Sequence, residues 1–225
     1  MSLVYKTIYI SLLIQIITTI ITLRGVNYKL KPEDQVLKEM LNLENIVQII
    51  EALMYFWIAL SVSDLENITN RRYLDWFITT PIMLLSTSVF MKYNNSEKNK
   101  NNKKITIKKF MKDNFYTIMK IVVLNFLMLL FGYLGEKKII NKNFSILIGF
   151  IFFFGTFKII HDNYVDKNIT NRNLFYGIFF IWSLYGIAAL LNNTAKNISY
   201  NFLDIISKNF YLLFLFYKIL KIKVD

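Results

Sequence analysis

A lysine and an aspartate stand inside the last long apolar stretch of the sequence, where a charge is costly unless it is paired or functional. Asp204 precedes Lys208 by four residues, so a helix carries both side chains on one face, one turn apart. Asn197, Asn201 and Tyr211 continue this face at spacings of three or four residues. The stripe indicates that the helix looks onto a polar interior. On spacing alone, Lys208 is either half of a structural ion pair or a functional amine.

A second group of polar and aromatic residues occupies the run from Arg72 to Pro81. At helical spacing, one broad face of this segment holds Arg72, Asp75, Trp76, Thr79, Thr80 and Met83. Asp75 is a second carboxylate in an apolar stretch, one turn from Arg72. Pro81 removes a backbone hydrogen bond and bends the helix, and threonine hydroxyls can satisfy the freed groups. Ordinary helix packing also produces such a face, and it also produces aromatic pairs such as Trp182 and Tyr185.

Two further segments carry polar stripes at spacings of three or four residues. One stripe is Glu44, Gln48, Glu51 and Tyr55, and the other is Ser11, Gln15, Thr18 and Thr22. Polar faces on neighbouring helices can line a water-filled path, and carboxylates in that path favour cations. The alternative is a hydrogen-bonded helix interface, with Glu44 solvated at the end of its helix.

The segments that carry these residues are apolar enough to cross a membrane. The 225 residues are 55% hydrophobic and 16% aromatic, which is unusual for a soluble domain. About 20 apolar residues span the hydrocarbon layer as a helix. We therefore predict an all-α membrane protein, a single domain over residues 1–225 that forms a bundle of seven transmembrane helices. The predicted spans are about 3–23, 38–61, 72–92, 114–134, 143–161, 173–191 and 199–220. Because the second span carries two glutamates, a six-helix bundle with that segment on the surface is the alternative.

Charge between the spans predicts the orientation. The net charge of +12 would suggest a nucleic-acid partner in a soluble protein. Here the basic residues lie between apolar segments and are more numerous on one side, which predicts an outside N-terminus and a cytoplasmic C-terminus. The Asn- and Lys-rich segment 94–109 is expected to be a solvated, mobile cytoplasmic loop. The sequence has no cysteine, which excludes disulfides and thiolate metal sites.

Taken together, these residues resemble the microbial rhodopsins over the whole bundle. The resemblance rests on the run Arg72-x-x-Asp75-Trp76-x-x-Thr79-Thr80-Pro81, on Asp204-x-x-x-Lys208 and on Trp182-Ser-x-Tyr185. It implies all-trans retinal bound to Lys208 as a Schiff base, with Asp75 and Asp204 as counterions and Arg72 beside them. It also implies that Trp76, Trp182 and Tyr185 line the polyene, with Thr79, Thr80 and Met83 nearby.

Departures from the family pattern bear on the function. Outward proton pumps usually have a carboxylate eleven residues after the position of Asp75, and here that position is Ser86. The segment 192–200 lacks the acids of the usual proton-release pair, and Gly186 stands where many relatives have proline. Channelrhodopsins also carry glutamates along their second helix. The set of Glu44 and Glu51 with Asp75, Thr79 and Ser86 looks like the first group of viral rhodopsins from large algal DNA viruses.

That resemblance implies a light-gated cation channel in the lipid bilayer, conducting monovalent cations or protons. The expected ion pathway is Ser11, Gln15, Glu44, Gln48, Glu51, Ser86, Asn197 and Asn201. The alternatives are a light-driven outward proton pump, a sensory rhodopsin with a separate transducer, and a retinal-free transporter or structural bundle. No enzymatic activity and no nucleic-acid partner are expected. A metal enzyme in particular is not expected, because the sole histidine, His161, falls at a helix end. Assembly into a homo-oligomer is left open.

Overall fold

The chain folds into a bundle of long helices. The computed structural model describes residues 3–60, 65–98 and 105–224. Its helices are α1 (Leu3–Leu23), α2 (Gln35–Ala59), α3 (Leu65–Lys98), α4 (Ile107–Asp113), α5 (Phe115–Glu136), α6 (Lys142–Tyr164) and α7 (Ile169–Ala188). A last rod follows without a break, as α8 (Asn193–Asp204), a π-helical turn η3 (Ile205–Asn209) and α9 (Phe210–Ile222).

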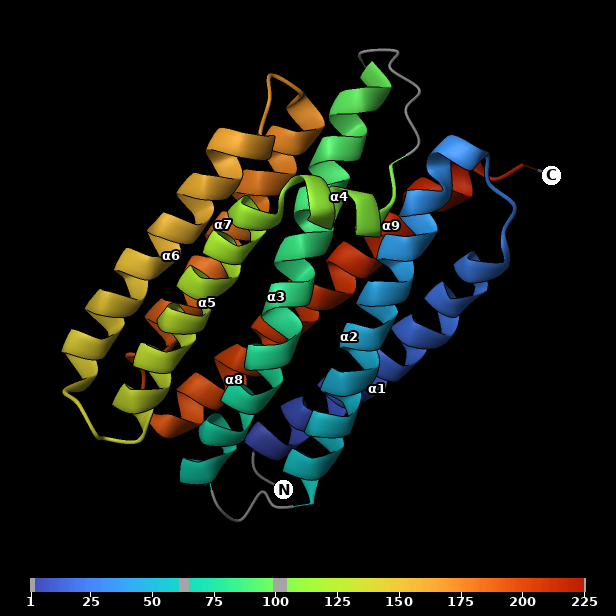
Figure 1. Cartoon of the computed structure of the whole chain (residues 1–225). Coiled ribbons are helices and arrows are strands. Elements are labelled where there is room, and N and C mark those ends of the chain that lie inside the picture. The colour runs from blue at the N-terminus through green and yellow to red at the C-terminus, as the bar shows by residue number, and fades with distance from the viewer. Residues whose placement is uncertain (1–2, 61–64, 99–104, 225) are drawn as a thin grey trace.

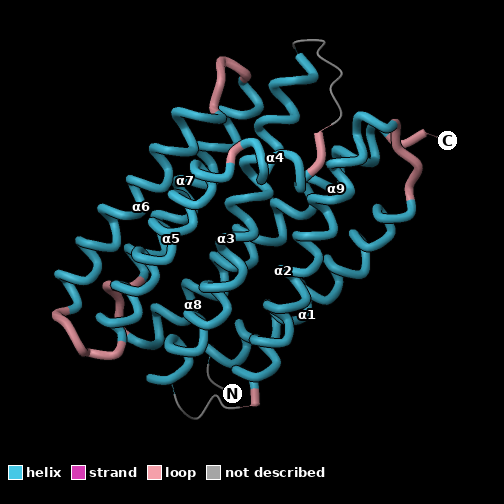
Figure 2. The backbone as a smooth tube through the Cα atoms, viewed as in Figure 1, coloured by secondary structure: helices cyan, strands magenta, loops and turns pink. Residues whose placement is uncertain are grey.

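Helices that follow one another in the sequence also pack side by side (Figures 1 and 2). Contacts run from α1 to α2, α2 to α3, α3 to α5, α5 to α6, α6 to α7 and α7 to α8. The last rod closes the bundle, because α8 and η3 contact α1, and η3 and α9 contact α2. The two termini lie at opposite ends, called here the N-end and the C-end (Figure 1).

The surface is that of an integral, multi-pass membrane protein. Large apolar side chains such as Leu13, Phe126, Leu147 and Phe180 are more than 49% exposed, while polar side chains face inward. Four described helical segments are long and apolar enough to cross a membrane: Leu3–Asn27, Asn67–Ser96, Phe115–Glu136 and Lys142–Tyr164. The remaining long helices are less hydrophobic. In α2 and in the α8–α9 rod, the reason is that the inward faces carry buried polar residues.

Polar contacts lengthen two helices beyond the predicted spans. The span predicted at 72–92 lies within the longer helix α3, and the expectation of a solvated loop from residue 94 is wrong for its first residues. Asn94 is buried, and its side-chain amide donates to the Asn171 side chain of α7 over 2.8 Å. The last rod begins at Asn193, earlier than predicted, because the Asn192 side chain accepts a hydrogen bond from Ala195 N and caps α8. Residues 99–104 of the predicted loop lie outside the described part.

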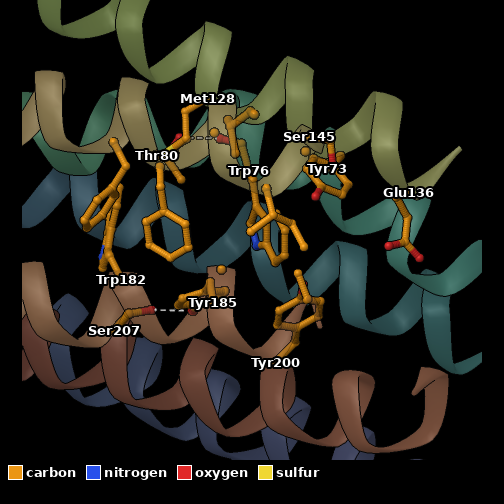
Figure 3. A pocket seen from close by; sticks show the side chains of 18 of the residues that line it. Tyr73, Trp76, Thr80, Met128, Glu136, Ser145, Trp182, Tyr185, Tyr200 and Ser207 are labelled. Atoms are coloured by element: carbon orange, nitrogen blue, oxygen red, sulfur yellow. Dashed lines mark hydrogen bonds between the residues drawn. The ribbon is translucent and has the colours of Figure 1, made fainter. Parts of the chain in front are cut away.

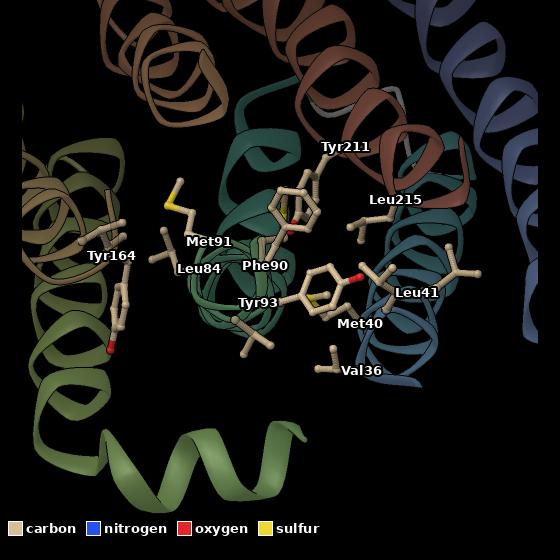
Figure 4. Packing of buried hydrophobic residues seen from close by; sticks show 14 of the residues in the cluster. Val36, Met40, Leu41, Leu84, Phe90, Met91, Tyr93, Tyr164, Tyr211 and Leu215 are labelled. Carbon is tan, nitrogen blue, oxygen red and sulfur yellow. The ribbon is translucent and has the colours of Figure 1, made fainter. Parts of the chain in front are cut away.

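Apolar residues fill the C-end half of the bundle. Figure 4 shows Met40 and Leu41 of α2, Phe90 of α3 and Tyr211 and Leu215 of α9 packed together in this cluster. These side chains come from segments far apart in the sequence, and all are 5% exposed or less. The cluster holds α2, α3 and the last rod together, and this fixes the position of Lys208 relative to α2 and α3.

The close approach of α5 and α6 gives a stability prediction. A Cβ atom on Gly135 would lie 1.9 Å from Ser145 Oγ and 2.6 Å from Ser145 Cβ, so Gly135→Ala forces the two helices apart. We expect a loss of about 1–3 kcal/mol in the free energy of unfolding, measured by denaturant titration in detergent. Gly177→Ala is the control, because nothing lies within 4 Å of the added Cβ. A Gly135→Ala protein as stable as Gly177→Ala would contradict the prediction.

Candidate functional site

Lys208 lies inside the bundle, on the π-helical turn of the last rod. Its side chain is 2% exposed. A π-turn inside an α-helix shifts the side chains that follow it around the axis, and such turns are frequent at functional sites. Ser207, Lys208 and Asn209 of this turn are all buried. The turn therefore holds the lysine away from solvent and from lipid.

Three carboxylates surround the Lys208 ammonium group. The Nζ atom donates to Asp75 Oδ2 over 2.7 Å, and it lies 3.0 Å from Glu51 Oε1 and 3.7 Å from Asp204 Oδ1. Asp75 comes from α3, Glu51 from α2 and Asp204 from the same rod as Lys208. A buried ammonium needs such partners, because its transfer from water without a counter-charge is prohibitively expensive.

Glu51 is predicted from the sequence to line an ion pathway, and the structure places it beside Lys208. Its side chain is fully buried, and neither oxygen has a hydrogen-bond partner of suitable geometry among the described residues. The polar stripe showed that Glu51 faces the interior. That it faces Lys208 follows only from the contact between α2 and η3.

Arg72 forms a second buried centre next to the first. Its NH1 nitrogen donates to Asp204 Oδ2 over 3.0 Å and to the Tyr55 hydroxyl over 2.9 Å. The Tyr55 hydroxyl donates to the same Asp204 oxygen over 2.7 Å, and the Tyr185 hydroxyl donates to Asp204 Oδ1 over 2.8 Å. Asp204 thus links Arg72 to the Lys208 site and has a partner for each oxygen. Tyr55, which the sequence marked only as part of a stripe, belongs to this network.

Asn197 and Asn201 lie on the N-end side of this network. Asn201 accepts a short hydrogen bond from Arg72, and its amide donates to Thr7 Oγ1 of α1 over 2.7 Å. Asn197 accepts a long bond of 3.5 Å from Arg72 Nε. Ser11 of α1 donates to the backbone carbonyl of Asn201 over 3.0 Å. These residues, predicted for an ion pathway, therefore tie α8 to α1 and α3 at the level of Arg72.

An elongated apolar pocket starts at Lys208. It encloses about 930 Å³, counting the open space at its mouth. Five residues predicted for the cofactor line it with Lys208: Trp76, Thr80, Met83, Trp182 and Tyr185. Figure 3 shows Trp182, Trp76 and Glu136 spread along its length. A long apolar molecule that reacts with an amine at one end, such as retinal, fits this lining.

The two threonines before Pro81 have different surroundings. Thr80 lines the pocket and accepts a hydrogen bond of 2.8 Å from the Asn125 amide of α5. Thr79 does not line it and donates instead to the Asp75 backbone carbonyl over 2.9 Å. Thr80 donates likewise to the Trp76 carbonyl. Neither hydroxyl thus donates to the carbonyl of Phe77, which Pro81 deprives of its helical partner.

Several buried polar groups lie between Lys208 and the C-end. Glu44 is 1% exposed, so the expectation of a solvated Glu44 is wrong. Its carboxylate lies close to the Ser86 hydroxyl, which is itself 3.2 Å from the Tyr211 hydroxyl. Buried side-chain atoms lack a protein partner among the described residues in Gln15, Glu44, Asn45, Gln48, Glu51 and Asn209. Asn45 and Asn209 were not singled out from the sequence.

A charged cluster at the N-end was also missed. Lys196 of α8 is 2% exposed and lies 2.5 Å from Glu136 at the end of α5. Glu136 and Lys142 line the far end of the pocket. The segment 192–200 contains no acidic residue, and Glu136 of α5 provides the carboxylate that pairs with Lys196. Only the folded chain shows this, because 60 residues separate the partners.

Comparison with known proteins identifies the family. The sequence profile of the bacteriorhodopsin-like proteins matches residues 6–222. The crystal structure of the viral rhodopsin OLPVRII superposes with a TM-score of 0.85 at 28% identity, covering 99% of this chain and 100% of that one. Blue light-absorbing proteorhodopsin from Med12 (TM-score 0.74) and Exiguobacterium sibiricum rhodopsin (0.71) are each 18% identical and share the fold, with 98% of this chain and 98% and 97% of theirs covered. No curated protein sequence matches the chain.

The resemblance to microbial rhodopsins is thereby confirmed, and the chain belongs to the bacteriorhodopsin-like family.

Proposed function

We propose that this protein binds all-trans retinal on Lys208 and is a light-gated cation channel. Members of its family bind a retinal chromophore. When bound, retinal supplies light absorption and a change of shape. Lys208 supplies the attachment point, and Trp76 and Trp182 supply the apolar walls. Asp75, hydrogen-bonded to the amine over 2.7 Å, and Asp204, at 3.7 Å, supply counter-charges. The proposed topology has seven spans, with the N-end outside and the C-end cytoplasmic.

The observation that carries the channel proposal is the row of buried polar groups without protein partners. Among the described residues, neither side-chain polar atom of Gln15, Gln48 or Asn209 has a hydrogen-bond partner, and Glu51 has only its ion pair with Lys208. They belong to α1, α2 and η3, which contact one another. Buried polar atoms are almost always hydrogen-bonded, so groups without protein partners are typically satisfied by internal water. A hydrated row that begins at Lys208 supports a path through the bundle.

The charge of the site favours cations in that path. Three carboxylates, Glu51, Asp75 and Asp204, face two cations, Lys208 and Arg72, which leaves one negative charge in excess when all are ionised. Glu44 adds a further carboxylate towards the C-end. Rings and rows of carboxylates favour cation passage over anion passage.

An outward proton pump is the second candidate, and one observation favours it. The position after Asp75 that carries a proton donor in pumps is Ser86 here, and the Glu44 carboxylate of α2 lies close to it. A carboxylate in that region is compatible with proton transfer from the C-end to the Lys208 site. A sensory rhodopsin with a separate transducer, and membership of the first group of viral rhodopsins, remain expectations from the sequence.

Attachment at Lys208 is tested by removing the amine. We expect Lys208→Ala to give no visible absorption band when all-trans retinal is added, because the other amine among the described residues that line the pocket, Lys142, lies at its far end. Absorption spectroscopy of the purified protein measures this. Lys120→Ala is the matched control, since Lys120 also lies in a long helix but is exposed, and it should keep the band. A band that survives in Lys208→Ala would exclude the attachment.

Photocurrents distinguish the channel from the pump. In whole-cell recordings we expect the current to reverse sign when the membrane voltage crosses the equilibrium potential of the permeant cation, since a channel only relaxes a gradient. Changing the external sodium or proton concentration should shift the reversal potential and so identify the ion. A current that stays outward against a reversed cation gradient would favour the pump and contradict the channel proposal.

The hydrated row predicts the effect of Gln48→Leu. The Gln48 side chain has no hydrogen bond to any of the residues that the structure describes, so leucine removes water ligands from the path at little cost to folding. We expect the photocurrent per protein to fall about tenfold, equivalent to about 1.4 kcal/mol in the barrier, while the absorption band stays. Ile49→Leu is the control, because Ile49 is 45% exposed on the same helix. Equal currents in both variants would contradict a path along this face of α2.

A further inference from the structure

The pocket that begins at Lys208 continues beyond the tryptophans. Past Trp76, Figure 3 shows Tyr73, Tyr200 and, farthest from Trp182, Glu136. Gly132, which lies against Tyr73, and Lys142, which is close to Glu136, also line this part. Both charged residues are partly exposed, whereas Lys208 is 2% exposed. The pocket therefore has a closed end at Lys208. Its mouth lies at the N-end of the bundle, where α5 ends and α6 begins.

Small residues form part of the pocket lining. They are Gly132 of α5, Gly149 of α6, Gly186 of α7 and Ala189, directly after α7. A Cβ on Gly149 would meet only one atom within 4 Å, the Met128 carbonyl oxygen at 3.7 Å. Gly186 has the opposite surroundings, since its Cβ would lie 2.5 Å from the Phe150 ring. Phe150 thus packs into the space left by Gly186, and the Tyr73 hydroxyl, 2.6 Å from an added Cβ, packs in the same way against Gly132. Of these three glycines, Gly149 is the one with open space beside it.

The rim of the mouth is polar and held in place. Lys196 and Glu136 form an ion pair of 2.5 Å that joins α8 to α5. The Lys142 ammonium group lies 3.5 Å from the Leu191 carbonyl oxygen, just after α7. The Lys142 side chain is partly exposed, which leaves N–H groups available to a polar group at the membrane surface.

From this arrangement we propose that the mouth between Glu136, Lys142 and Ala189 is the route by which retinal reaches Lys208, aldehyde end first. The inference rests on the proposed attachment of retinal to Lys208. The Lys208 amine lies at the closed end of the pocket, so the aldehyde end of retinal must enter first. The bulky ring then follows into the part of the pocket lined by glycines. The Lys142 ammonium group is a hydrogen-bond donor that can meet the aldehyde oxygen at the rim.

The absence of cysteine from the sequence allows a direct test. Ala189→Cys places a single thiol beside the mouth, where a bulky maleimide narrows the route. Retinal-free protein in membranes is labelled, all-trans retinal is added, and the rise of the visible band is followed in time. We expect the labelled protein to form the band about tenfold more slowly than the same protein without label, corresponding to a barrier higher by about 1.4 kcal/mol.

Two controls separate access from binding. Ile187→Cys, on the same helix and 52% exposed, should form the band at one rate with or without label. Ala189→Cys labelled after retinal is bound should keep its band, since the route has already been used.

Three outcomes would overturn the proposal: an unchanged rate in labelled Ala189→Cys, a thiol at this position that the reagent does not reach, or loss of the band on late labelling. A protein that forms no band even without substitution or label would instead refute retinal binding itself.

Discussion

The burial of one ammonium group governs this structure. Lys208 is buried inside the bundle, and a charge there is tolerated only among compensating charges. Asp75, Glu51 and Asp204 provide them from α3, α2 and the last rod. Removing one partner from such a buried pair typically costs about 3–5 kcal/mol. The relative positions of these helices are therefore constrained by the charge that they enclose.

The same constraint creates a site that responds to small movements. Charges in a low-dielectric interior interact strongly, so a small displacement of the Lys208 nitrogen changes its energy with each carboxylate. Asp204 is also bonded to Arg72, Tyr55 and Tyr185, and it transmits such a change to the N-end side. Glu51 has no such partners and lies on the helix that carries the polar row towards the C-end. A disturbance at the lysine thus reaches both halves of the bundle.

The two polar ends of the molecule differ in kind. At the N-end, Lys196, Glu136, Arg72 and the asparagines are paired with one another. Towards the C-end, many buried polar atoms have no protein partner, and an apolar cluster lies around them. Groups paired within the protein, such as Arg72 and Asp204, are held in one arrangement, whereas groups that depend on water can be rearranged at lower cost. Such a difference suits a protein in which the access of ions to the C-end side is regulated.

Much of the bundle could be predicted from the sequence alone, because the length of an apolar segment indicates a helix and a polar stripe indicates its inward face. The pairing of Asp204 with Lys208 could be predicted too, because the two residues are one helical turn apart. The extension of α3 past residue 92 could not, because it depends on the amide contact between Asn94 and Asn171. Glu51 beside Lys208, Glu44 beside Ser86 and Glu136 beside Lys196 were likewise decided by tertiary structure. A helical period tells which face a residue occupies. Its partner is set by how the helices pack, and each of these pairs joins helices that only folding brings together.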